Sequence, residues 1–280
     1  MKVCLECLPC FLSQTIKTMR RITHDEKAVR DVLNSVCRIL PRQPENATPA
    51  EIGREVYRLI SLKTGVADPY RELKEQCTRR ALKIYPDMKQ RVERSQDRLL
   101  TAAKMAIAGN IIDFGADTVF ELEKDVEAVL SRPFGINHFP DFAASIKSAG
   151  RIVYLGDNAG ETVFDRILIE EISAPVIYTV RSAPVINDAV KKDAEEAGIP
   201  DAARIETSGC DAPGTILSKC TPKFRKLLGK ADVIISKGQG NYEALSGKNL
   251  PIFFLLTAKC QAVARDLGVV PGDIVLKRAG

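Results

Sequence analysis

A short apolar run that ends in polar residues is the part of this sequence best suited to chemistry. Residues 152–155 read IVYL, residues 156–161 read GDNAGE, and a helical pattern follows at once. The run predicts a buried strand, the glycines permit a tight turn, and the next helix presents the positive end of its dipole. Carboxylate and carboxamide oxygens beside an anion-binding helix end suit a metal-assisted reaction on a phosphate.

A third oxygen ligand follows the next strand-like run, at residues 176–180. Ligands of an open parallel sheet bind outside the carboxyl ends of its strands, so we expect Asp157, Asn158 and Asp188 to converge. Two carboxylates and a carboxamide oxygen would suit Mg²⁺ or Mn²⁺. The same residues would also serve simply to turn the chain and cap helices, and the sequence alone leaves both interpretations open.

Two further strand ends carry candidate phosphate ligands. Lys237-Gly238-Gln239-Gly240-Asn241 follows an apolar run at 233–236, and Lys259 follows another at 252–256. Loop amides could cradle phosphate oxygens there while a lysine offsets their charge. The order of residues is not that of a P-loop. An ordinary strand-to-helix loop with an exposed lysine explains each segment equally well.

Three of the eight cysteines, Cys4, Cys7 and Cys10, lie within seven residues. Zinc usually takes four ligands, and an iron–sulfur cluster would lack its fourth cysteine nearby. A redox-active pair at the start of a helix is a third interpretation. The chain has only two histidines, His24 and His138, which makes a histidine-based triad a poor model.

Two regions of different character must position these residues. The first half is helical in pattern, with capping boxes predicted at Thr23–Glu26 and Thr48–Glu51, a break at Pro86 and one long helix over 88–108. Two more helices are expected near 119–130 and 140–149. From about residue 150, short apolar runs alternate with helical stretches, at 151–155, 176–180, 204–206, 233–236, 252–256 and 274–277.

The predicted fold class is therefore α/β. We expect a mainly helical domain or cap over residues 1–149, which carries the cysteine cluster. A Rossmann-like, mostly parallel sheet with flanking helices should follow over residues 150–280 and carry the metal and phosphate residues. Two further acids, Asp113 and Glu161, are candidates to contact the metal ligands from behind. Asp113 lies in the segment Asn110–Gly115 at the end of a predicted helix, and a helix-terminating turn explains it as well.

Composition narrows the class of function. The 280 residues are 45% hydrophobic and 28% charged, with a formal net charge of +5 and no run of five like charges. This predicts a mildly basic surface that suits a small anionic substrate and argues against a nucleic-acid partner. The absence of a long apolar stretch argues against a membrane span, and the acidic, cysteine-bearing start argues against a signal peptide. We expect a cytoplasmic protein of undetermined oligomeric state.

Five segments, in this order, resemble the damage-control phosphatases, and the cysteine motif is similar to that of their subfamily I. The segments are Glu6–Cys10, Asn110–Gly115, Gly156–Glu161, Pro184–Asp188 and Lys237–Glu243. The resemblance implies a metal-dependent phosphatase of phosphorylated metabolites, often damaged or excess sugar phosphates. It implies catalytic metal ligands at Asp157, Asn158 and Asp188 for Mn²⁺, Ni²⁺, Co²⁺ or Mg²⁺.

The same resemblance assigns the remaining motifs. Residues Lys237 through Asn241 and Lys259 correspond to the substrate phosphate site. Cys7 and Cys10 correspond to a Cys-x-x-Cys pair that activity requires, whereas Cys4 lies outside the pattern. Asp157 or Asp188 could also act as a nucleophile, but we favour attack by water because metal coordination would occupy both carboxylates.

Two other classes of function are open at this stage. A nucleotide- or S-adenosylmethionine-dependent transferase would also place a glycine-bearing turn after its first strand. The turn here lacks the Gly-x-Gly motif that lets the backbone approach a cofactor. Arg181 also occupies the strand end where an acidic residue would bind the ribose hydroxyls of such a cofactor, and a basic residue is better suited to a phosphate. The other alternative is a non-catalytic module that binds a metal or cluster through the N-terminal cysteines.

Overall fold

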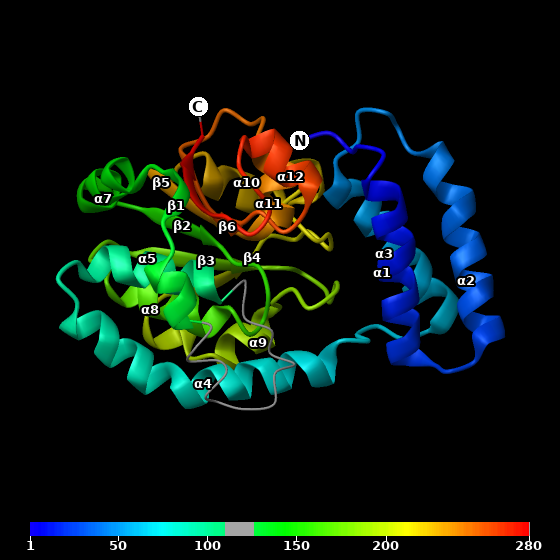
Figure 1. The fold of residues 1–280 in the computed structure, drawn as a ribbon, viewed down its shortest axis with the longest axis horizontal. Coiled ribbons are helices and arrows are strands. Elements are labelled where there is room, and N and C mark those ends of the chain that lie inside the picture. The colour runs from blue at the N-terminus through cyan, green and yellow to red at the C-terminus, as the bar shows by residue number, and fades with distance from the viewer. Residues whose placement is uncertain (110–125, 280) are drawn as a thin grey trace.

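The computed structural model describes residues 1–109 and 126–279 (Figure 1). The described residues form a seven-stranded sheet in the order β1-β7-β6-β5-β2-β3-β4. The strands are β1 (Phe134–Asn137), β2 (Ile152–Leu155), β3 (Val176–Val180), β4 (Arg204–Thr207), β5 (Val233–Lys237), β6 (Ile252–Thr257) and β7 (Ile274–Arg278). Strands β2 to β6 run parallel to their neighbours among themselves, and β7 pairs antiparallel with β6. The predicted α/β class with a mostly parallel sheet is confirmed.

Helices cover both faces of the sheet and form a separate group at the N-terminus. The α-helices are α1 (Cys7–Ile22), α2 (Glu26–Ile39), α3 (Pro49–Thr64), α4 (Arg71–Arg94), α5 (Arg98–Ala108), α7 (Phe139–Ser148), α8 (Thr162–Glu170), α9 (Lys191–Glu196), α10 (Pro222–Leu228), α11 (Gly238–Leu245) and α12 (Gln261–Leu267). Short 3₁₀ helices are η1 (Leu40–Arg42), η2 (Ile199–Asp201) and η3 (Leu217–Lys219). Residues 126–131 are also helical. No described helix has the length and apolar character that crossing a membrane requires.

Alternation along the strands divides the core in two. Ile152 and Tyr154 of β2 pack with α4, α5 and α8 on one face, whereas Val153 and Leu155 pack with α10, α11 and α12 on the other. Side chains of successive strand residues point to opposite faces, so an uninterrupted apolar run is what a sheet buried on both faces requires. All four residues of β2 are buried.

The N-terminal helices have a core of their own. Buried apolar residues of α1, α2 and α3 form a third cluster, and these helices lie together at the right of Figure 1. Thr48 and Glu51 make the predicted capping box at the start of α3. The box predicted at Thr23 is wrong, because Asp25 is the residue that caps α2, accepting a hydrogen bond from the Lys27 backbone N–H.

Two predictions about the middle of the first half are also wrong. Pro86 lies inside α4, whose buried face runs on through Ala81, Ile84 and Met88 and so outweighs the backbone hydrogen bond that proline loses. The long helix expected over 88–108 is broken, because Asp97 accepts a hydrogen bond from the Leu100 backbone N–H and starts α5.

The sheet also includes residues that precede position 150. Strand β1 was not predicted, yet it pairs with β7 at one edge of the sheet. Helices α4 and α5 contribute to the same apolar cluster as the sheet. The division of the chain into two domains at residue 150 stays a prediction, but β1, α4 and α5 pack with the elements that follow it. The helix expected near 119–130 lies partly outside the described residues.

Candidate active site

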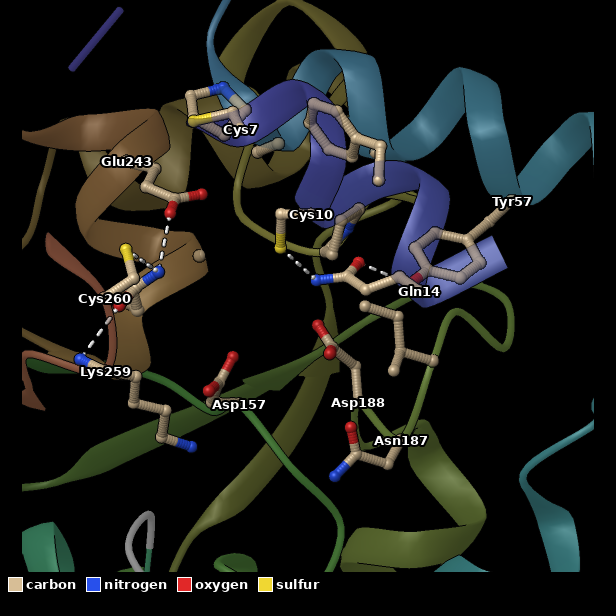
Figure 2. Close-up of a pocket in the computed structure, with 18 of the residues that line it drawn as sticks. Cys7, Cys10, Gln14, Tyr57, Asp157, Asn187, Asp188, Glu243, Lys259 and Cys260 are labelled. Atoms are coloured by element: carbon tan, nitrogen blue, oxygen red, sulfur yellow. Dashed lines mark hydrogen bonds between the residues drawn. The ribbon is translucent and has the colours of Figure 1, made fainter. Parts of the chain in front are cut away.

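A pocket of about 390 Å³ lies where the carboxyl ends of the central strands face α1 and α3. Its floor comes from the loops after β2 and β3, and its roof includes Cys7, Cys10 and Gln14 of α1 (Figure 2). Tyr57 of α3 closes one side, and Lys259, just after β6, lies on the opposite side. The predicted convergence of polar residues at this edge of the sheet is therefore observed.

Asp157 and Asp188 are brought together by backbone pairing between the two loops that carry them. The Ala189 N–H donates to the Asp157 carbonyl over 2.7 Å, and the Ala159 N–H donates to the Asn187 carbonyl over 2.9 Å. Between these bonds, Asn158 and Asp188 form an isolated antiparallel bridge. Figure 2 shows both carboxylates on the floor of the same pocket. These bonds join the two loops into one platform beneath the pocket.

Arg181 lies beneath this platform. Its Nε donates to the Asp188 carboxylate over 2.6 Å, and its Nη2 is 3.6 Å from an Asp157 oxygen. Its Nη1 donates to Thr215 and Asn241. The side chain is only 3% exposed and does not line the pocket. The expectation that this basic residue suits a phosphate is wrong, because its charge is directed to the two carboxylates.

The two carboxylates are electrostatically costly in the absence of a further cation. Burial, together with the charges of Asp188 and Glu161, raises the pKa of Asp157 well above its usual range. Burial also raises the pKa of Asp188, although Arg181 opposes this effect. One guanidinium therefore does not balance the negative charge in this part of the site, and a divalent cation would.

The donor set fits such a cation. Asn158 donates from its Nδ2 to the carboxylates of Asp157 and Glu161, so its amide oxygen is not used in these two contacts. Two carboxylate groups and one amide oxygen are the hard ligands that Mg²⁺ or Mn²⁺ takes, with water completing the shell. Among residues 1–109 and 126–279, no cluster of three or more His, Cys, Asp or Glu side chains is arranged to hold a metal. The candidate set therefore consists of two carboxylates and one amide group.

Lys237 is placed differently from the prediction. Its side chain is 0% exposed, and its Nζ donates to the Asp165 carboxylate over 2.6 Å and to Glu161 over 3.3 Å. It does not line the pocket. A lysine that is enclosed between two carboxylates does not face the pocket, which differs from the position that the predicted contact with phosphate requires. It instead holds Glu161, which in turn accepts the hydrogen bond from Asn158.

Asp165 anchors this buried network. Its two oxygens accept hydrogen bonds from the hydroxyls of Tyr154 and Tyr178, over 2.7 and 2.8 Å. Burial raises the pKa of Asp165 even though Lys237 counteracts it. Glu161 is 1% exposed and lies behind Asn158, the kind of position expected of it. Asp113, the other residue expected there, lies outside the described residues.

Some of residues 237–241 are buried beneath the pocket, and others line it. Asn241 is fully buried, donating to the carbonyls of Gly156 and Lys237 and accepting from Thr215, and so does not face the pocket as the predicted contact with phosphate requires. Gly238 has φ +75°, and a Cβ there would collide with the Asp157 carboxylate. Only glycine therefore permits β5 to turn into α11 so close to Asp157.

Gln239, Gly240 and Lys259 are the predicted phosphate residues that do line the pocket. Gln239 and Gly240 belong to the first turn of α11, where backbone N–H groups have no partner within the helix. The Gln239 side chain accepts a hydrogen bond from the Lys259 backbone N–H over 3.2 Å and so joins the two strand-end loops. A helix N-terminus beside a lysine is a favourable place for an anion.

The cysteines are also gathered at the pocket. Cys7 and Cys10 line its roof, and Cys260, which the sequence did not single out, lines the side formed by α12. Glu243 of α11 lies nearby, where burial raises its pKa to about 7. The amide of Gln239 donates to Glu243 over 2.9 Å and lies 3.5 Å from the Cys260 sulfur.

The sequence analysis did not identify the buried residues that hold the pocket side chains in place. Asp165 and Thr215 give no local signal of a site, because their partners lie on other elements. One hint for Asp165 was available, since it is a carboxylate one helical turn after Glu161 and is flanked by the apolar residues Val163, Phe164, Ile167 and Leu168.

Comparison with known proteins agrees with this architecture. The family model of the damage-control phosphatase ARMT1-like domain matches residues 3–275. A damage-control phosphatase of Archaeoglobus fulgidus is 37% identical over 289 residues, with 99% of each chain covered. A damage-control phosphatase of Pyrococcus horikoshii is 36% identical and covers 99% of this chain and 98% of its own.

One further relative, and a crystal structure of the Pyrococcus horikoshii relative, cover nearly the whole length. An uncharacterised protein of Methanocaldococcus jannaschii is 36% identical over 99% of this chain and 96% of its own. The crystal structure of a DUF89 family protein from Pyrococcus horikoshii superposes with a TM-score of 0.94 at 36% identity and full coverage of both chains. The fold, the full-length sequence similarity and the family model agree, and this chain belongs to the damage-control phosphatase ARMT1-like domain family.

Proposed function

We propose that this protein is a metal-dependent phosphatase that hydrolyses phosphate monoesters of small metabolites. The observation that carries the proposal is the buried pair of carboxylates, Asp157 and Asp188, at the floor of a pocket. Burial and the charge of Glu161 raise the pKa of both groups, and buried carboxylates with a perturbed pKa at a pocket are typical of functional sites. The names of the relatives from Archaeoglobus and Pyrococcus support a phosphatase.

Asp157, Asn158 and Asp188 would hold the metal. When bound, a divalent ion such as Mn²⁺, Ni²⁺, Co²⁺ or Mg²⁺ would polarise the phosphoryl group and lower the pKa of a water molecule. The buried residues beneath would keep the ligands in place. Arg181 fixes the Asp188 carboxylate, and Glu161 fixes the amide of Asn158. These contacts orient the ligands before the substrate arrives.

The chain's own groups would bind the substrate phosphate on the side of β5 and β6. Lys259 would offset the charge of the equatorial oxygens, and the first-turn amides of α11 at Gln239 and Gly240 would donate hydrogen bonds to them. We favour attack by water over attack by a carboxylate, since Asp188 is already held by Arg181 and both acids are assigned to the metal.

The pocket volume, about 390 Å³, suits a substrate of the size of a sugar phosphate. The part of the substrate away from the phosphate would face α1 and α3, where Gln14 and Tyr57 form a hydrogen-bonded pair at 2.8 Å. The N-terminal helices would therefore select the substrate, and a phosphorylated metabolite that is damaged or present in excess is the class we propose.

Phosphate release by metal-stripped, reduced protein tests the proposal. Sugar phosphates and a generic aryl phosphate would each be assayed without metal and with added Mn²⁺, Ni²⁺, Co²⁺ or Mg²⁺. We expect release only when a metal is present and a ranking among the sugar phosphates. Absence of release with every metal, from protein shown to be folded by circular dichroism, would reject the function.

A further inference from the structure

The three N-terminal thiols, although evenly spaced in sequence, are not equivalent in the structure. The Sγ atoms of Cys4 and Cys7 are 3.4 Å apart. The Sγ of Cys10 instead lies 3.3 Å from the side-chain amide nitrogen of Gln14, one turn further along α1. The contact between sulfurs therefore joins Cys4 to Cys7, and not the pair Cys7 and Cys10 of the family motif.

The backbone turn between Cys4 and Cys7 is compatible with a disulfide. The Cys7 N–H donates to the Cys4 carbonyl over 3.0 Å, which closes a turn of four residues just before α1. The ends of such a turn lie within about 7 Å of each other at Cα, and disulfides span about 4.4–6.8 Å between Cα atoms. Residues 1–4 are outside any helix or strand, so a small rotation at Cys4 can close the remaining gap.

The two thiols also differ in their surroundings. Cys4 is half-buried and lines a surface hollow with Lys2 and Arg265, where a small oxidant from solvent can reach it. Cys7 lines the substrate pocket, where burial raises its pKa to about 12. Cys4 is thus the thiol placed to react first with an oxidant, and Cys7 is the neighbour placed to complete the bond.

We propose that Cys4 and Cys7 form a reversible disulfide in response to a hydroperoxide. The Cys4 thiolate attacks the terminal peroxide oxygen, the O–O bond breaks, and the departing alkoxide (hydroxide from hydrogen peroxide) takes up a proton and leaves as an alcohol or as water. The Cys7 sulfur then attacks the Cys4 sulfur while its proton passes to the departing hydroxyl of the sulfenic acid, which forms the S–S bond and releases water. Two thiols are oxidised and one hydroperoxide is reduced, and a small dithiol reverses the change.

This bond would affect the pocket through its anchoring at the N-terminus. The Met1 ammonium group donates to the Glu243 carbonyl over 3.0 Å and to the Ser246 hydroxyl over 2.8 Å, so the first residues are seated on α11. The disulfide would join this seated segment to the first residue of α1 and remove the Cys7 thiol from the pocket wall. We therefore expect the oxidised form to turn over substrate several-fold more slowly.

Mass mapping of the cysteines tests the bond without relying on phosphatase activity. Protein treated with hydrogen peroxide is alkylated and digested with trypsin, and cleavage after Lys2 and Lys17 releases all three thiols in one peptide. We expect a peptide that has lost two hydrogens between Cys4 and Cys7 and carries one alkyl group on Cys10. The bond should persist in Cys10→Ser and in the control Cys37→Ser, and be absent in Cys4→Ser.

Two results would overturn the proposal. One is a disulfide that includes Cys10, and the other is oxidation of Cys4 or Cys7 to a sulfinic acid without any bond. A second measurement tests the effect on the pocket. Turnover of oxidised wild type should recover with dithiothreitol, while peroxide should leave Cys4→Ser unchanged; turnover that is the same with and without the mapped bond would reject the effect. Because mapping needs no substrate, failure of the bond and failure of the proposed phosphatase are distinguishable.

Discussion

Arg181 donates a hydrogen bond from Nε to the Asp188 carboxylate over 2.6 Å, and both side chains are almost wholly buried under the pocket. The same guanidinium approaches Asp157. One positive charge thus offsets part of the negative charge of two buried carboxylates. The platform of the site depends on this residue, although it does not face the substrate.

We predict that Arg181→Met destabilises the metal-free protein by about 3–5 kcal/mol, the usual cost of leaving a buried partner charge unpaired. Urea unfolding followed by circular dichroism measures the change. Arg204→Met is the matched control, since the Arg204 side chain is 65% exposed and its loss should cost under about 0.5 kcal/mol. Equal stability of the two variants would show that Arg181 does not carry the charge balance.

Lys237 and Lys259 were both predicted from the sequence to bind the substrate phosphate, and we expect their substitutions to have different effects on stability and activity. Lys237→Met leaves Asp165 and Glu161 buried without their cation, so we predict a loss of about 3–5 kcal/mol in the free energy of unfolding. Lys259→Met removes an exposed side chain and should change stability by under about 0.5 kcal/mol while lowering kcat/KM about 10- to 100-fold. Unfolding curves and kinetics on both variants decide, and an unstable Lys259→Met with normal kcat/KM would contradict the assignment.

Glu243 should make stability depend on pH near neutrality. Burial raises its pKa from 4.5 in the unfolded chain to about 7 in the folded protein, so the folded state holds this proton more tightly. The resulting stabilisation is complete below pH 4.5 and is lost as the pH rises through about 7. Glu243→Gln, which resembles the protonated form, should therefore match wild type at low pH and exceed its stability above pH 7.

Thermal unfolding across this pH range measures the difference. Glu45→Gln is the control, because Glu45 is exposed and lies outside the residues that line the pocket. Parallel curves for wild type and Glu243→Gln at all pH values would contradict a raised pKa at Glu243.

Ile186 has φ +46°, and it is the one non-glycine residue with a positive φ in the described parts of the chain. This conformation is strained for a β-branched residue, at a cost of about 1–2 kcal/mol. Replacing alanine by glycine normally destabilises a protein by about 0.5–1 kcal/mol. We predict the reverse order here, with Ile186→Gly more stable than Ile186→Ala.

The neighbouring residue supplies the control for that order. Val185 is buried and has an ordinary φ, so Val185→Ala should be more stable than Val185→Gly. Chemical unfolding of the four variants gives both differences. If glycine is the less stable substitution at both positions, the backbone at Ile186 is not strained. Ile186 lines the pocket, and strained backbone conformations cluster at functional sites because the surrounding structure holds them in place.

The sequence predicted the strand ends well because they follow simple rules. Short apolar runs bounded by turn residues located β2, β3, β5 and β6, and parallel strands bring their carboxyl ends to one edge. Asp157 and Asp188 therefore converge as expected. Strand β1 escaped notice because its four residues, FGIN, include a glycine and only alternate residues of it are half-buried.

What the sequence could not predict is the direction of a side chain at a strand end. Lys237 and Lys259 both end apolar runs, yet one is enclosed and the other faces the pocket. The difference lies in Asp165, Tyr154 and Tyr178, which belong to other elements and create a buried acceptor for Lys237. Contacts among side chains from several elements depend on tertiary packing and produce no pattern in the local sequence.

The central claim is that Asp157 and Asp188 hold the metal on which phosphate release depends. The most direct measurement titrates Mn²⁺ into three metal-stripped proteins, the wild type, Asp157→Asn and the control Asp141→Asn. Asp141 is an exposed acid outside the residues that line the pocket. Calorimetry records metal binding, and phosphate release is measured in the same samples. We predict that wild type and Asp141→Asn bind Mn²⁺ and release phosphate together, and that Asp157→Asn does neither. Phosphate release by metal-free wild type, or undiminished release by Asp157→Asn, would contradict the account.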